Sequence, residues 1–96
     1  MTKADIVSQI SEQTGMEKGD VQVTVEAFMR AVRNNLESGE NVYLRGFGSF
    51  VVKTRAAKTG RNILAKKSIQ IPAHNIPSFK PSKDFVENVK VSVKVK

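Results

Sequence analysis

The chain has 96 residues, a net charge of +7 and no cysteine. Its length fits one domain with a core near the lower limit of stability, and the absence of cysteine excludes disulfides and favours a reducing cytoplasm. No segment approaches the roughly 20 apolar residues that span a bilayer, and the N-terminus has no apolar signal region, so neither a membrane protein nor a membrane-binding one is expected.

The first 40 residues predict two helices. Thr2 and Asp5 have capping-box spacing, and Gly15 ends the helix that they begin. A second helix begins within residues 17–20 and ends at residues 38–39. Its apolar residues recur at threes and fours along one face. They are Val21, Val25, Phe28, Met29, Val32 and Leu36. We expect this stripe to pack both in its own subunit and against a symmetry mate.

The pattern changes to β-structure at Asn41. Residues 42–44 predict a short strand, residues 46–48 a turn, and residues 49–56 a longer β-branched strand. These strands are followed by residues 59–62, whose composition is typical of a turn. An antiparallel sheet with one extended hairpin is therefore expected.

The returning part of the hairpin is predicted over residues 68–73, where apolar and polar residues alternate. Pro77 and Pro81 are expected to end the strand region, since proline cannot donate to a ladder. Ser82 is a good N-cap for a short third helix that carries Phe85, Val86 and Val89. Whether the Val89–Lys96 tail extends that helix or frays stays open.

The charge is divided unevenly along the chain. Residues 41–83 hold nine Lys or Arg residues and no Asp or Glu, whereas residues 1–40 hold four basic and seven acidic residues. A long segment of one sign attracts polyanions, while a merely soluble surface mixes both signs. The partner that this pattern favours is nucleic acid.

The outer half of the predicted hairpin, residues 53–67, is too polar to bury in the protein's own core. An isolated two-stranded hairpin is only marginally stable, so this segment should project as an arm until a polyanion orders it. Its basic residues are Lys53, Arg55, Lys58, Arg61, Lys66 and Lys67.

The rest of the chain is small for a core, and oligomerisation is a common remedy. We therefore predict a homodimer whose core gathers the large apolar side chains of the second helix and the sheet. These are Phe28, Met29, Val32, Phe47, Phe50 and Phe79.

No enzymatic constellation is recognisable in the sequence. His74 is the single histidine and has no cysteine with which to share a metal ion, so a loop or strand role is the simpler interpretation. Residues 46–48 lack the third glycine of a dinucleotide fingerprint. We expect no catalytic residue, no metal, no cofactor and no small-molecule substrate.

Several short motifs resemble the bacterial histone-like HU family, which includes integration host factor. The motifs are Gly46-Phe47-Gly48-Ser49-Phe50, Arg55-Ala56-Ala57-Lys58-Thr59-Gly60-Arg61-Asn62, Ile71-Pro72-Ala73 and Pro77-Ser78-Phe79-Lys80. The resemblance covers essentially the whole chain. It implies an α+β fold and an intertwined dimer, with two N-terminal helices, a three-stranded antiparallel sheet with protruding β-ribbon arms, and a short C-terminal helix.

The resemblance also implies a division of one domain over residues 1–96. Residues 1–40 would form a helical dimerisation part, residues 41–81 the β-saddle with an arm at about 53–76, and residues 82–96 the last helix. The arm residues named above, with Asn62, would contact backbone and minor groove. The body of the protein would contact DNA phosphates as well. The residues expected to do so are Lys3, Arg45, Gly46, Gly48, Ser49, Lys80 and Lys83.

The chain departs from the family at the arm tip, where relatives usually have Arg-Asn-Pro and insert the proline between base pairs. Here Ile63 follows Arg61 and Asn62. Isoleucine is among the residues that act as such wedges, although it keeps an N–H and a looser backbone. The tip is thus expected either to insert Ile63 or to contact only the backbone. A second departure, residues 80–83, changes the start of the last helix.

The function implied is architectural binding of double-stranded DNA in the bacterial nucleoid, with bending or compaction and a preference for bent, nicked or flexible sites. Two alternatives remain open. One is a sequence-specific subunit like those of integration host factor, and the other is a small basic RNA-binding protein.

Overall fold

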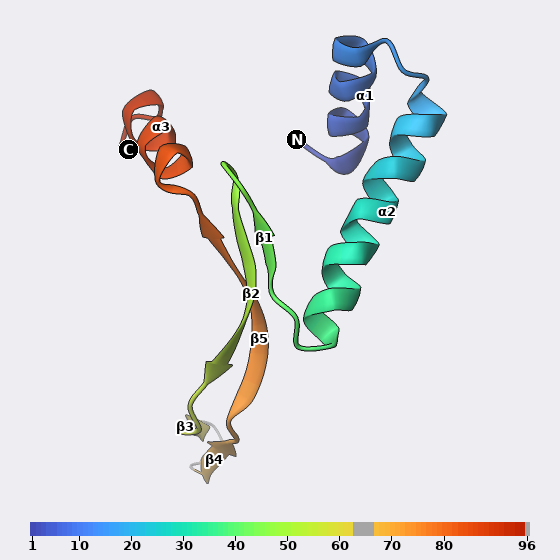
Figure 1. Cartoon of the computed structure of the whole chain (residues 1–96). Helices are drawn as coiled ribbons and strands as arrows, with labels where there is room; N and C mark the ends of the chain where they lie inside the picture. Colours follow the sequence, from blue (N-terminus) through green and yellow to red (C-terminus); the bar gives the residue numbers. More distant parts are fainter. Residues whose placement is uncertain (63–66, 96) are drawn as a thin grey trace.

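The computed structural model describes the backbone of residues 1–62 and 67–95 and the side chains of residues 1–58 and 71–95. Two helices precede the strands and one follows them (Figure 1). The elements are α1 (Lys3–Thr14), α2 (Lys18–Glu37), β1 (Val42–Leu44), β2 (Gly48–Arg55), β3 (Lys58–Asn62), β4 (Lys67–Ile71), β5 (His74–Pro81) and α3 (Lys83–Ser92). The α+β class expected from the sequence is confirmed.

Local capping fixes the start and end of α1. The Thr2 hydroxyl accepts from the Asp5 backbone N–H at 3.4 Å, and the Asp5 carboxylate accepts from the Thr2 N–H at 2.9 Å. Gly15 ends the helix with φ 76°, a left-handed conformation that favours glycine. These observations confirm the predicted capping box and stop signal.

The hairpin of α1 and α2 is held by a small apolar contact. Val7 and Val21 are only 5% and 2% exposed and are the buried apolar residues of the described part of the chain. The C-terminal half of α2 approaches β1 and β2, whereas α3 stands at the far end of β5 (Figure 1). Among the described residues, the fully buried apolar side chains thus lie on α1 and α2 and not between these helices and the sheet.

The predicted three-stranded antiparallel sheet is confirmed, in the order β1-β2-β5. Phe50 pairs with Val42 on one side and with Phe79 on the other. Pairing between β2 and β5 runs the whole length of both strands, from Gly48 opposite Pro81 to Arg55 opposite His74. This long ribbon carries the base of the arm away from the helices.

Two predictions in this region were wrong. Residues 59–62 are not a turn but belong to β3, which pairs with β4 from Lys58 opposite Ile71 to Asn62 opposite Lys67. Their turn-like composition is outweighed by cross-strand pairing, which local propensity does not report. The returning strand also ends at Ile71, and residues 72–73 separate it from β5.

Pro77 does not end the strand region. It lies inside β5, opposite Val52. β5 is an edge strand of the sheet, and an edge tolerates a residue without an N–H. Pro81 is the last residue of the strand, as expected. The segment from Val89 onward extends the third helix only in part. α3 ends at Ser92, and the chain leaves it in an extended conformation at Val93.

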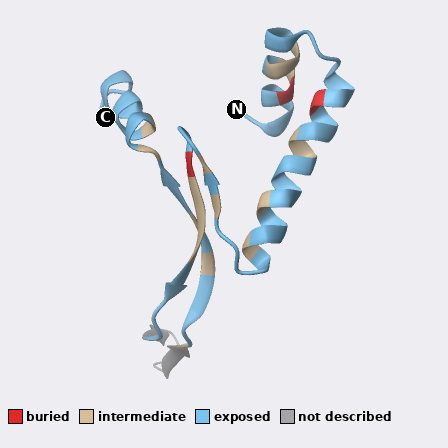
Figure 2. Cartoon of the chain, in the orientation of Figure 1, coloured by how far each residue is buried: buried red, intermediate tan, exposed pale blue. Residues whose placement is uncertain are grey.

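Most described residues are exposed in the single chain (Figure 2). The radius of gyration is 18.9 Å, against about 12.5 Å for a compact domain of this length. The solvent-accessible area is 8376 Å², against about 5,500 Å² for a compact monomer of this mass. The isolated chain thus leaves a large area uncovered.

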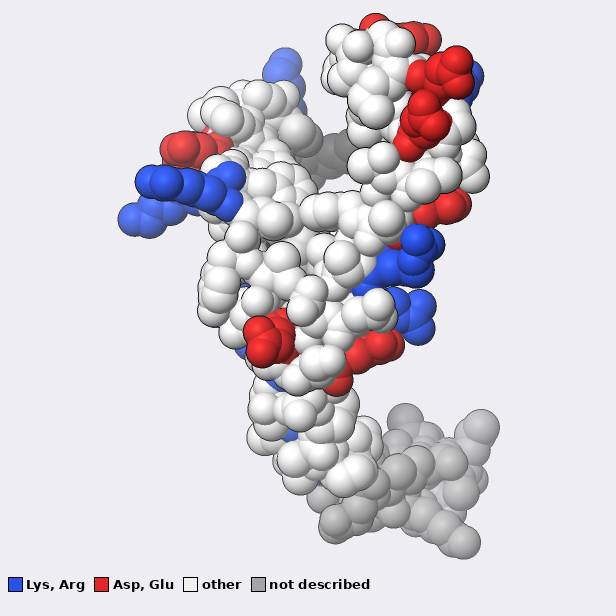
Figure 3. Space-filling view, turned by 45° about the vertical axis from the view of Figure 1, so that its right-hand side comes forward, with Lys and Arg blue, Asp and Glu red and all other residues white. Residues whose placement is uncertain are grey.

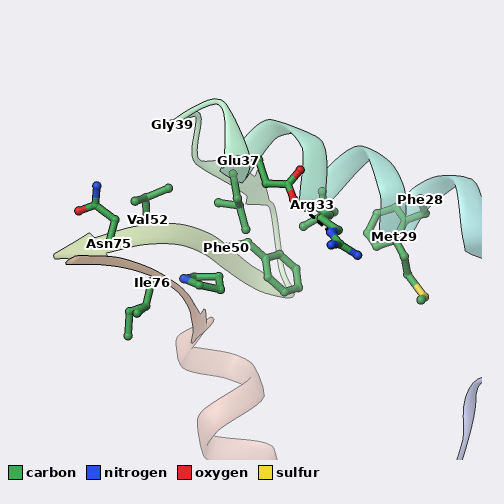
Figure 4. A pocket seen from close by; sticks show the side chains of 12 residues that line it. Phe28, Met29, Arg33, Glu37, Gly39, Phe50, Val52, Asn75 and Ile76 are labelled. Atoms are coloured by element: carbon green, nitrogen blue, oxygen red, sulfur yellow. Dashed lines mark hydrogen bonds and ion pairs between the residues drawn. The ribbon is translucent and has the colours of Figure 1, made fainter. Parts of the chain in front are cut away.

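Part of that uncovered area is an apolar groove between α2 and the sheet, with a volume of about 720 Å³ (Figure 4). Its residues come from α2, the following turn, β2 and β5. They are Phe28, Met29, Val32, Arg33, Leu36, Glu37, Gly39, Phe50, Val52, Asn75, Ile76 and Pro77. An ion pair between Arg33 and Glu37, at 3.2 Å, lies at its edge.

Candidate nucleic-acid interface

The register of β2 against β5 sorts the ribbon into two faces, because side chains alternate along a strand and paired residues share a face. Phe50 and Val52 face the groove beside α2. The intervening residues of β2 therefore form the opposite face, which we call the outer face. It carries Ser49, Val51, Lys53 and Arg55, together with their partners Lys80, Ser78 and His74, while Ile76, the partner of Lys53, also lines the groove.

The outer face brings together the predicted cations of the arm base and of the body. Lys53 and Arg55 are two residues apart on β2, and Lys80 stands opposite Ser49 at the other end of the ribbon. All three cations are exposed, and residues 41–83 contain no carboxylate side chain. The face therefore presents positive charge with no internal neutralisation, as polyanion binding requires.

The Gly46–Gly48 turn at the end of this face is built for close backbone approach. Gly46 has φ 80°, and the Phe47 N–H donates to the Leu44 carbonyl at 3.0 Å. A Cβ on Gly48 would lie 2.5 Å from the Lys80 carbonyl oxygen and 2.7 Å from the Phe79 ring. Close packing against β5 therefore favours glycine at position 48, the first residue of β2.

A hollow of about 420 Å³ lies beside the turn and includes both cations of this end of the sheet, Arg45 and Lys80. The rest of its lining includes hydroxyl-bearing, glycine and apolar residues. The residues are Tyr43, Leu44, Arg45, Gly46, Gly48, Ser49, Lys80, Pro81 and Ser82. The two cations, with the hydroxyl groups of Tyr43 and Ser49, offer hydrogen bonds to a phosphate group.

Ser82 fixes the start of α3 against the same turn. Its backbone N–H donates to the Phe47 carbonyl at 2.9 Å, and its hydroxyl donates to the Gly46 carbonyl at 3.2 Å. The hydroxyl also accepts from the Phe85 N–H at 3.2 Å, as an N-cap does. Lys83, the first residue of α3, is thereby held next to the hollow.

Lys3 is placed differently from the other predicted body residues. It lies on α1, which packs on α2, and its Nζ is 3.0 Å from Glu26 Oε1. This hydrogen-bonded pairing, with help from Gln22, lowers the pKa of the Glu26 carboxyl. A phosphate would have to compete with Glu26 for Lys3.

The arm residues beyond the sheet lie on β3 and β4. Lys58 begins β3, Arg61 and Asn62 end it, and Lys67 begins β4. Ile63 and Lys66, the predicted wedge and one arm cation, lie outside the described residues.

Two outer-face residues were missed by sequence reasoning. Tyr43 is 71% exposed and stands opposite Ser49, and His74 stands opposite Arg55. Neither belongs to a local motif, and only the strand register places them among the cations. Thr54 and Asn75, paired on the other face, share a hydrogen bond of 2.7 Å that locks the arm base.

The six residues predicted for a dimer core form two groups that share Phe50. Phe28, Met29 and Val32 line the groove with Phe50. Phe47, Phe50 and Phe79 also form an aromatic cluster with Phe85 of α3, with the Phe50 and Phe79 ring centroids 4.9 Å apart. Phe28 and Phe47 remain 48% and 45% exposed.

Acidic side chains gather on the helical hairpin at the upper right of Figure 3. Others lie beside basic side chains lower on the molecule and at its left, and the area between them is largely uncharged. Within the described ranges, no helix is long and apolar enough to cross a bilayer.

Comparison with known proteins agrees with this geometry. The family model described as bacterial DNA-binding protein matches residues 1–90. DNA-binding protein HU of Thermus thermophilus is 43% identical over 90 residues, which are 94% of this chain and 93% of the relative. The same protein of Staphylococcus aureus is 40% identical over 94% of this chain and all of its own.

Among solved structures, HU of Anabaena in a cocrystal with DNA matches with a TM-score of 0.86 and 31% identity, over 98% of this chain and 100% of that one. Both the sequence and the fold therefore match over almost the full length. The chain belongs to the bacterial DNA-binding protein family and, within it, to the HU proteins.

Proposed function

We propose that this chain is an architectural protein that binds double-stranded DNA without sequence specificity, as a homodimer, and bends it. The observation that carries the proposal is the outer face of the β2–β5 ribbon, where Lys53, Arg55 and Lys80 lie on one carboxylate-free surface. The DNA cocrystal of the similar Anabaena HU supports the choice of ligand. The site of action is the bacterial nucleoid, and the role needs no catalysis, metal or cofactor.

The arm cations neutralise phosphates and release counterions, a contribution that is independent of sequence and falls with salt. They are Lys53, Arg55, Lys58, Arg61, Lys66 and Lys67, with Asn62 at the groove. Bending then brings flanking DNA onto the body, at Lys3, Arg45, Lys80, Lys83 and the turn with Gly46, Gly48 and Ser49. DNA that is already bent, nicked or flexible costs less to deform and is bound preferentially.

The surface left uncovered by the single chain supports the homodimer. Its accessible area exceeds that of a compact monomer by roughly 2,900 Å², which is enough for the interfaces of obligate dimers and for a projecting arm. The groove beside α2 is lined by Phe28, Met29 and Val32, and the same helix from a second copy fits such an isologous contact.

The salt dependence of binding tests the contact through the arm. If about eight phosphates are neutralised, a plot of the logarithm of the binding constant against the logarithm of the salt concentration has a slope near −7. Replacing Arg55, Lys58 and Arg61 together with alanine removes most binding and leaves the dimer intact. The control replaces Lys18, Arg30 and Lys90, which lie on helices, and loses far less. A parent slope shallower than about −3, or full binding by the arm variant, would contradict the proposal.

Ile63 is proposed as the wedge that unstacks a base step. Ile63→Ala should then reduce the bend, measured by energy transfer between the two ends of a labelled duplex, more than it reduces affinity. The bend stays unchanged if the tip contacts only the backbone.

Competition assays separate the proposal from its alternatives. Because the minor groove offers few distinguishing groups, random duplexes should compete with one another almost equally. Preferential retention of one duplex sequence would indicate a sequence-specific relative, and stronger competition by RNA at fixed salt would indicate an RNA-binding protein.

A further inference from the structure

His74 lies at the base of the arm, and the function proposed above gives it no role. It begins β5, directly opposite Arg55 of β2, and its side chain is exposed. Residues that pair across strands share a face, so His74 lies on the surface that carries Arg55 and Lys53. It is the only histidine of the chain.

The imidazole ring of His74 is oriented by the backbone carbonyl of Pro72, two residues earlier. Nδ1 lies 3.0 Å from the Pro72 carbonyl oxygen. A carbonyl oxygen only accepts, so Nδ1 carries the proton in this contact. The chemistry that His74 offers to a ligand is then decided by Nε2, which is a bare lone pair in the neutral ring and an N–H donor in the imidazolium.

The surroundings of the ring are cationic. Arg55 faces it from β2, with Lys53 two residues further along, and Lys58 lies opposite Ile71 where β3 and β4 meet. No residue from 41 to 83 carries a carboxylate that could balance an additional charge. An imidazolium at this position therefore finds its counter-charge in an external anion.

We propose that His74 contacts DNA as the imidazolium, so that an arm whose ring is neutral takes up a proton when it binds. The inference rests on the proposed function, since it requires the outer face to meet DNA. Phosphate oxygens accept hydrogen bonds, as do adenine N3 and thymine O2 in the minor groove. In the neutral ring, the lone pair of Nε2 would be repelled by these acceptors. In the protonated ring, Nε2 donates a charge-assisted hydrogen bond to them.

The proposal makes DNA affinity depend on pH through a single type of side chain. Histidine changes its charge between about pH 5 and 8, where the lysines and arginines of the arm keep theirs. Protonation is favoured in the complex, so affinity rises as pH falls. With one such ring in each arm, we expect the affinity of the dimer to rise about tenfold across this range.

The experiment measures the affinity of the full chain for a nicked duplex between about pH 5.5 and pH 8 at fixed salt. Calorimetry at one intermediate pH, in two buffers of different ionisation enthalpy, counts the protons taken up. His74→Gln removes the ionisable ring and should flatten the affinity to within about twofold. His74→Lys keeps a permanent cation and should bind tightly at every pH. Circular dichroism at both ends of the pH range checks that each variant stays folded.

Proton uptake by the parent together with a flat His74→Gln profile supports the inference. An equal pH dependence in parent and His74→Gln, or no proton uptake by the parent, overturns it. The variant lacking Arg55, Lys58 and Arg61 separates this failure from that of the proposed function. If that variant binds normally, the arm is not the DNA site, whereas weak binding with no effect of His74 overturns only the inference.

Discussion

Gly48 stands where the sheet and an aromatic ring converge. A methyl group there would meet the Lys80 carbonyl and the Phe79 ring, and both neighbours are held by the β2–β5 ladder and the phenylalanine cluster. Because neither can move freely, Gly48→Ala should lower the free energy of unfolding by about 1–3 kcal/mol. Urea denaturation at fixed protein concentration measures the change.

Gly19 is the matched control for this substitution. It lies in α2, its φ is not positive, and a Cβ there meets nothing within 4 Å. Gly19→Ala should therefore leave stability unchanged or raise it by up to about 1 kcal/mol. Equal stabilities of the two variants would mean that β5 shifts without cost and that close packing does not explain glycine at position 48.

At the scale of elements, the cap of α3 links a helix to the candidate phosphate site. Ser82→Ala removes the hydroxyl that accepts from Phe85 and donates to the Gly46 carbonyl. We expect a loss of about 1–2 kcal/mol in the free energy of unfolding. Ser92→Ala, at the exposed end of the same helix, should change it by less than about 0.5 kcal/mol. Equal effects in urea titrations would show that the Ser82 hydroxyl contributes nothing special.

Elements whose limits depend on local interactions were predicted well from the sequence. Thr2, Asp5, Gly15 and Ser82 act within one helical turn, so the helix ends follow from residue types. β3 was missed because residues 59–62 have a turn-like composition and are a strand only through pairing with β4.

The candidate site likewise has residues that the sequence predicted and residues that it did not. Its cations were predictable, because an acid-free stretch is visible in the sequence itself. Tyr43 and His74 were not, because they join those cations only through the register of β1 and β5 against β2. The Lys3–Glu26 pair, which spans two helices, was equally invisible to local patterns.

At the scale of the whole molecule, an elongated chain that measures 58 × 35 × 28 Å carries a net charge of −3 over residues 1–40 and of +9 over residues 41–83. The acidic helical part is repelled by DNA, whereas the cationic ribbon is attracted to it. This asymmetry orients an approaching duplex toward the sheet. It also leaves the largely apolar groove beside α2 for contacts between subunits.

The groove yields the last prediction, which compares one substitution at two positions of the same helix. Val32 lines the groove, whereas Val23 is 65% exposed. The two residues are nine positions apart, which at 3.6 residues per turn places them on opposite faces of α2. Val32→Glu should bury an unpaired carboxylate in the subunit contact and destabilise the dimer by about 3 kcal/mol or more, whereas Val23→Glu should cost under about 0.5 kcal/mol.

Sedimentation equilibrium and thermal unfolding at several protein concentrations measure both effects. For a dimer that folds as it associates, the parent and Val23→Glu show a Tm that rises with concentration, because mass action favours the folded pair. Val32→Glu should sediment as a monomer or unfold at a lower Tm. A Val32→Glu protein with the parent's mass and the parent's Tm would place the subunit contact elsewhere, because a carboxylate at the centre of this groove cannot be buried there without cost.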